Sequence, residues 1–81
     1  MALYTPRPED LYKEHKKDLE AYRLELQYFE QRHSLELRNS ETPIFYIRRL
    51  EDLISDLKQK VQRQTERCSY YLNQWRKEKT L

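Results

Sequence analysis

The side chains best suited to chemistry are one cysteine and two histidines. Cys68 can act as a nucleophile or a metal ligand only if a base or further ligands stand beside it. His15 and His33 share a helical face, but at ~1.5 Å per residue they lie about 27 Å apart along a helix, too far to bind one metal ion. We predict no catalytic residue, no metal site and no cofactor. Cys68 is interpreted as a small buried apolar side chain.

The basic side chains of the C-terminal half offer a second chemistry, which is phosphate binding. The 81 residues carry 16 Lys and Arg against 14 Asp and Glu, so the net charge is only +2. Acidic residues are interleaved with the basic ones, and no helix-turn-helix or zinc knuckle is recognisable. A nucleic-acid-binding accessory protein is therefore the alternative function. Its candidate phosphate contacts are Arg63, Arg67, Arg76 and Lys77.

The composition indicates that helices position these side chains. The chain has no glycine and three prolines, so it lacks the residues that tight β-hairpin turns require. Charged residues make up 37% of the chain, which is typical of disorder, but opposite charges nearly cancel and the apolar residues are regularly spaced. A length of 81 residues predicts a single domain, 1–81, with a short arm at 1–7 and a tail at 79–81.

Proline and capping residues mark the limits of two helices. Acidic residues follow Pro8 and complement the dipole at the start of a first helix over about 8–38. Thr42 is placed to cap a second helix over about 43–78, with Pro43 in its first position. Between the helices, Asn39 can adopt a left-handed conformation. Near-equal lengths and a short connector predict an all-α fold, an antiparallel two-helix hairpin.

One apolar stripe on each helix predicts a seam between them. In the second helix the stripe recurs at alternating steps of three and four residues, and Gln64 is its polar interruption. Closing the hairpin sets residues whose numbers sum to about 81 opposite each other. This predicts a polar layer of His15 with Gln64, which would fix the register. The predicted hairpin seam comprises Leu19, Tyr22, Leu26, Phe29, Ile47, Leu50, Ile54, Leu57 and Val61.

The first helix has a second apolar stripe, which one hairpin cannot bury. It comprises Ala21, Leu24, Tyr28 and Leu35, on the side of the helix away from the seam. Long apolar strips in water usually mark interaction sites. We predict that a second copy covers the stripe, in a homodimeric four-helix bundle or coiled coil, or that another helical protein does. The predicted function is a non-enzymatic protein–protein interaction module: an adaptor, an assembly factor or a regulatory subunit.

Aromatic residues are expected to gather where the two chain ends meet. Tyr4 and Tyr12 should approach the C-terminal end of the second helix, next to its basic tail. There Tyr70, Tyr71 and Trp75 form either a candidate hot spot for a partner or a plug that prevents fraying.

Membrane and secreted classes are not predicted. No apolar run approaches the ~18 residues of a membrane span, and the N-terminus lacks the basic and apolar regions of a secretory signal. One cysteine excludes an internal disulfide framework. We therefore expect a reducing, cytoplasmic location, with no membrane partner and no small-molecule substrate.

Overall fold

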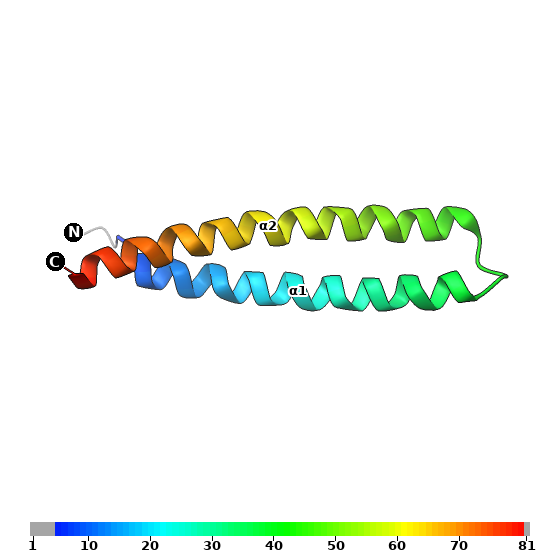
Figure 1. The fold of residues 1–81 in the computed structure, drawn as a ribbon, viewed down its shortest axis with the longest axis horizontal. Helices are drawn as coiled ribbons and strands as arrows, with labels where there is room; N and C mark the ends of the chain where they lie inside the picture. The colour runs from blue at the N-terminus through cyan, green and yellow to red at the C-terminus, as the bar shows by residue number, and fades with distance from the viewer. Residues whose placement is uncertain (1–4, 81) are drawn as a thin grey trace.

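The chain folds as two long helices lying side by side. In a computed structural model, which describes residues 5–80, α1 spans Pro8–Arg38 and α2 spans Ile44–Thr80, and no strand occurs in that range. The helices run antiparallel, so the start of α1 and the end of α2 lie at the same end of a molecule 60 Å long (Figure 1). The predicted all-α antiparallel hairpin is confirmed, and the limits predicted for the first helix coincide with those of α1.

Charge and proline explain the start of α1. Arg7 precedes it in an extended conformation, with φ −79° and ψ 155°, and contributes no side-chain cap. Proline at the first helical position lacks the N–H that would otherwise be left unpaired, and Glu9 and Asp10 lie near the positive end of the helix dipole. Lys13 Nζ pairs with Glu9 Oε1 one turn away, at 2.9 Å.

The connector differs from the prediction in two respects. Asn39 is not left-handed but extended, with φ −93° and ψ 108°, and its Oδ1 accepts a hydrogen bond from the Glu41 amide at 3.0 Å. Thr42 does not cap α2, because its hydroxyl donates to the Glu36 carboxylate at 2.6 Å. A charged acceptor makes a stronger hydrogen bond than a neutral one, which explains why the Thr42 hydroxyl bonds to the Glu36 carboxylate and does not cap α2.

The second helix also has slightly different limits from those predicted. It begins at Ile44 rather than at Pro43 and continues to Thr80 rather than ending near residue 78. The amides of Tyr46 and Ile47 donate to the Pro43 carbonyl, so Pro43 directly precedes the helix and closes its first turn. Differences of one or two residues are usual at helix ends.

The core is a single line of side chains between the helices. Buried residues are few, because two helices can cover only one side of each other. The buried residues are Leu19, Leu50, Ile54, Leu57, Gln64 and Cys68. The remaining seam residues are half-buried: Tyr22, Leu26, Phe29, Ile47 and Val61.

Candidate functional site

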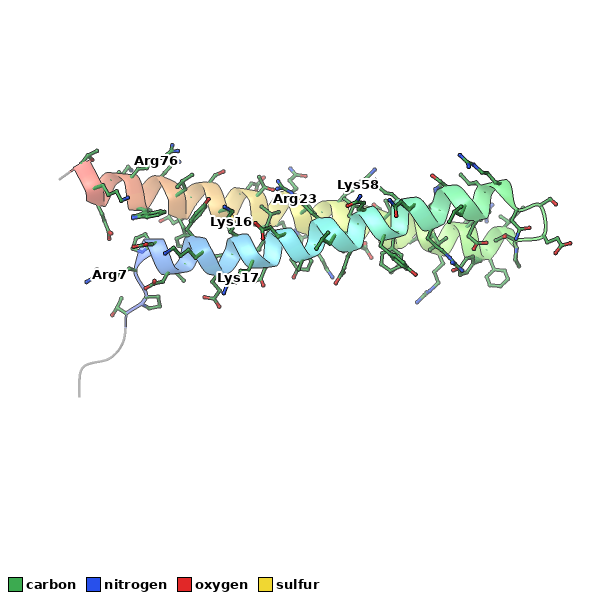
Figure 2. The ribbon with its side chains drawn as sticks, turned by 90° about the horizontal axis from the view of Figure 1, so that it is seen from below. Arg7, Lys16, Lys17, Arg23, Lys58 and Arg76 are labelled. Atoms are coloured by element: carbon green, nitrogen blue, oxygen red, sulfur yellow. The ribbon has the colours of Figure 1, made fainter. Side chains whose placement is uncertain are left out.

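The second apolar stripe of α1 lies in solvent. Leu24 is 68% exposed, Tyr28 60% and Leu35 59%, and Ala21 is also exposed. At ~100° per residue, the four side chains fall within a sector of about 60°, on the side of α1 opposite its buried seam. Figure 2 shows Lys17, one turn before Ala21, projecting on the side of α1 away from α2. No other part of the described chain covers this stripe.

A comparable stripe is missing from the described length of α2. Its half-buried apolar residues outside the central seam are Tyr46, Leu53 and Leu72. Its exposed large apolar side chains are Tyr70 and, at its start, Ile44 and Phe45. The surplus of apolar surface along the hairpin therefore belongs to α1.

Sequence reasoning missed an apolar patch around the connector. Leu37 is 57% exposed, Ile44 68% and Phe45 75%. These residues belong to no heptad stripe, so periodicity could not find them. The signal available was the number of large apolar residues immediately beside a predicted turn.

The predicted polar layer is present and is tightly bonded. Gln64, 3% exposed, places its Nε2 at 2.9 Å from His15 Nδ1 and at 3.4 Å from the His15 carbonyl oxygen. Arg67 Nη1 donates to Gln64 Oε1 at 3.1 Å, which identifies the other amide atom as the donor nitrogen. His15 Nδ1 therefore accepts a hydrogen bond, and the neutral imidazole carries its proton on Nε2. The His15 ring also stacks on Tyr71 at 5.3 Å.

Aromatic residues gather at the open end, as the sequence predicts, except that Tyr4 lies outside the described residues. The Tyr12 and Trp75 rings are 5.9 Å apart, and Tyr70 and Tyr71 are in edge contact at 5.2 Å. Trp75 and Tyr71 are half-buried between the helices. Tyr70 alone of the predicted hot spot is largely exposed, at 59%. This arrangement is typical of a plug, with Tyr70 as its outward-facing edge.

The predicted phosphate contacts do not form one surface. Arg63 and Arg67 line two adjoining hollows, one of about 360 Å³ and the other of about 180 Å³. Arg76 follows Arg63 by thirteen residues, which at ~100° per residue places it on the opposite side of α2. Figure 2 shows Arg76 along the same edge as Lys58. Lys77 lies on the Arg63 side, at the far end of the helix. The further side chains that line the two hollows are Tyr22, Lys60, Gln64, Glu66, Tyr70 and Tyr71.

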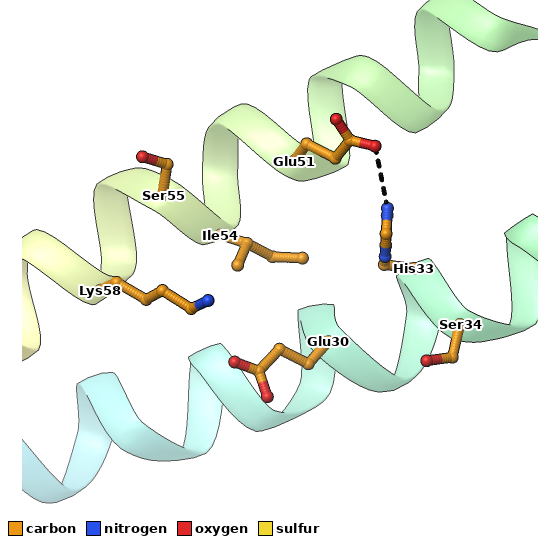
Figure 3. A pocket seen from close by; sticks show the side chains of 7 residues that line it. All are labelled: Glu30, His33, Ser34, Glu51, Ile54, Ser55 and Lys58. Carbon is orange, nitrogen blue, oxygen red and sulfur yellow. Dashed lines mark hydrogen bonds and ion pairs between the residues drawn. The ribbon is translucent and has the colours of Figure 1, made fainter.

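A broad depression of about 570 Å³ lies between the helices (Figure 3). His33 Nε2 lies 3.2 Å from Glu51 Oε1 across it, and Ile54 forms its apolar floor. Its polar lining mixes acids with Lys58 and is open to solvent. Among residues 5–80 no group of three His, Cys, Asp or Glu side chains is arranged to hold a metal ion. Nor is either described helix long and apolar enough to cross a membrane.

Cys68 lies within the seam. It is a free thiol and only 7% exposed. Burial raises the pKa of the Cys68 thiol, and the positive charges of Arg23 and Lys16 offset part of that rise. A thiol in this setting is mostly protonated at neutral pH and is a weak nucleophile.

Comparison with known proteins does not assign the chain to a family. No protein-family model, curated protein or solved structure matches it. Its function must therefore be inferred from the surfaces described above.

Proposed function

We propose that this chain is a non-enzymatic protein–protein interaction module, which binds another helix through the exposed apolar stripe of α1. It would serve as an adaptor, an assembly factor or a regulatory subunit. The observation that supports the proposal is the exposure of Leu24, Tyr28 and Leu35 on one side of α1. Apolar anchors at this spacing are what one helix presents to another. The hairpin's own core is already satisfied by the opposite side of α1.

The stripe has the size of a reversible docking site. Burying Leu24, Tyr28 and Leu35 would each contribute roughly 1.5–3 kcal/mol. Association itself costs ~4 kcal/mol or more in lost translational and rotational freedom. The surplus is modest, so we expect a complex that forms and dissociates readily. Such behaviour suits an adaptor better than a permanent subunit.

The position of the stripe also defines the shape of an assembly. Each helix of a compact four-helix bundle contacts two neighbours, which requires two adjacent apolar faces. In α1 the seam and the stripe lie on opposite sides. A second hairpin docked on the stripe would therefore form an open layer in the order α2, α1, α1, α2. This refines the homodimeric bundle that the sequence predicts.

The stripe is tested by introducing charge. The double substitution Leu24→Glu and Tyr28→Glu should abolish association while leaving the helical circular-dichroism signal unchanged, because both side chains lie in solvent. Molar mass measured by light scattering over a wide concentration range, together with binding of any captured partner, gives the readout.

A matched control places the same charges elsewhere. Leu37→Glu with Phe45→Glu alters two equally exposed apolar residues outside the stripe and should leave association intact. If the Leu24 and Tyr28 double variant associated like the unmodified chain, the proposed binding face would be wrong.

Nucleic-acid binding is the second candidate function, and the hollows around Arg63 and Arg67 favour it. Guanidinium groups beside tyrosine rings suit a phosphate and a stacked base. Against it, Glu66 lines the same hollow. We expect Arg63→Ala with Arg67→Ala to weaken single-stranded nucleic-acid binding and reduce its salt dependence, if such binding occurs. The matched control is Lys58→Ala with Arg76→Ala, on the other side of α2. Equal losses from both pairs would indicate nonspecific charge attraction.

A further inference from the structure

Resting on the proposed function, we infer that the partner is a second copy of this chain, docked antiparallel along α1 with a two-fold axis beside Tyr28. The charges that flank the stripe support this orientation. In an antiparallel dimer, opposite charges from the two copies face each other. In a parallel dimer, like charges face each other and repel.

The stripe and its flanks form a short heptad pattern. Ala21, Leu24, Tyr28, Gln31 and Leu35 follow steps of three and four residues, and Gln31 is exposed like the others. Glu25 and Arg32 flank one side of this line. Glu20 flanks the other side, followed there by Gln27 and Ser34, and Arg38 ends the line itself in the last turn of α1.

A parallel second copy brings like charges together. In a parallel pair of helices, a flanking residue that precedes a core position faces a flanking residue of the other helix. The residue it faces has a number higher by five. That rule pairs Glu20 with Glu25 of the second copy. By symmetry the repulsion occurs twice. No basic side chain on the same flank offsets this repulsion, because the flanking residue one heptad after Glu20 is the uncharged Gln27.

An antiparallel copy brings opposite charges together. With the axis beside Tyr28, residues whose numbers sum to about 57 lie opposite each other. Glu25 then faces Arg32 of the second copy, and Glu20 lies level with the last turn of that copy's α1, which carries Arg38.

The same register also matches the apolar side chains. Leu24 lies near Leu35 of the second copy, and the small Ala21 leaves room beside that leucine. The two Tyr28 rings meet on the axis. Each contact is repeated by the two-fold symmetry, as an interface between identical surfaces requires.

These charges are available for such contacts. Glu20, Glu25 and Arg38 are exposed, and within residues 5–80 none of them forms an ion pair. Arg32 is 47% exposed, and its Nε is held 3.3 Å from Glu36 Oε1. The guanidinium also interacts with Tyr46 of α2, so it lies on the side of α1 between the stripe and the second helix. Complementary flanks select orientation and partner more than they add affinity.

Cross-linking tests the orientation. In a Cys68→Ala background, the single variant Ala21→Cys should not cross-link to itself through a short bismaleimide, because the two thiols would be about 22 Å apart along the axis. Leu35→Cys alone should behave in the same way. An equimolar mixture of the two variants should cross-link efficiently.

Charge exchange tests the pairing. Glu25→Arg should weaken the dimer roughly tenfold, because it makes two attractive pairs repulsive. Adding Arg32→Glu should restore association. Glu14→Arg is the matched control: it lies seven residues before Ala21, beyond the end of the second copy's α1, and should have no effect.

The outcomes separate this inference from the function on which it rests. A dimer in which Ala21→Cys cross-links to itself, or in which the double exchange restores nothing, overturns the antiparallel arrangement and leaves the docking face standing. A monomer at every concentration overturns self-association and leaves another helical protein as the occupant. Mixed cross-linking together with rescue by the double exchange establishes the inference.

Discussion

The buried amide of Gln64 fixes the tautomer of the neutral His15 ring. Arg67 donates to the amide oxygen, so the amide nitrogen must donate to His15 Nδ1. The proton of the neutral ring is therefore on Nε2. A polar layer in an otherwise apolar seam thus fixes the register of the two helices and the orientation of the imidazole.

This hydrogen bond predicts a loss of stability when the Gln64 amide is removed. Gln64→Ala should lower the free energy of unfolding by ~1 kcal/mol or more, because His15 Nδ1 loses its donor within the seam. Thermal melts of the unmodified chain and the variant measure the change.

Among the elements, α1 has the more varied environment because both of its sides carry apolar residues. One side is the hairpin seam and the other is the exposed stripe. Substituting a leucine in the seam should therefore change stability, whereas substituting a leucine in the stripe should change the proposed association. The second helix contributes most of the buried residues and has a single apolar side. Stability and the proposed binding should therefore be separable by substitution.

Truncation of leucine measures this separation. Leu57→Ala should lower the free energy of unfolding by ~2–5 kcal/mol, because Leu57 is 5% exposed and its removal leaves a cavity. Leu35→Ala is the matched substitution in the stripe. It should change unfolding by less than ~0.5 kcal/mol at dilutions where the chain is monomeric, while weakening association. Urea unfolding followed by circular dichroism gives both values. Equal losses would mean that the stripe is buried after all.

The periodic parts of this fold were predictable from sequence, and the aperiodic parts were not. Heptad spacing predicted both helices, the stripe and the layer of His15 with Gln64, because each depends only on which residues share a helical side. The role of Thr42 was not predictable, because its hydroxyl donates to Glu36. The position of Glu36 depends on how the end of α1 packs against α2. The hollows around Arg63 were also missed. They exist only where side chains from both helices meet at particular heights.

The whole molecule is a thin rod with different chemistry at its two ends. The connector end exposes Leu37, Ile44 and Phe45, and the open end holds an aromatic cluster with a cation, Lys79 Nζ, 4.5 Å from the Trp75 ring centre. Between them the long sides differ: apolar on α1 and largely polar on α2. In the proposed dimer, docking along the stripe of α1 would leave both ends of the hairpin exposed.

The geometry of the hairpin also implies an order of events in time. The side-chain hydrogen bonds of the hairpin join residues at increasing separations along the chain. Glu36 and Thr42 are 6 residues apart, His33 and Glu51 are 18 apart, and His15 and Gln64 are 49 apart. Closing a longer loop costs more entropy, but once an inner contact exists the next one needs to close only a few additional residues. Contacts between the two helices should therefore form first beside the connector and then progressively farther from it. The aromatic end would be the last part to form and the first to open.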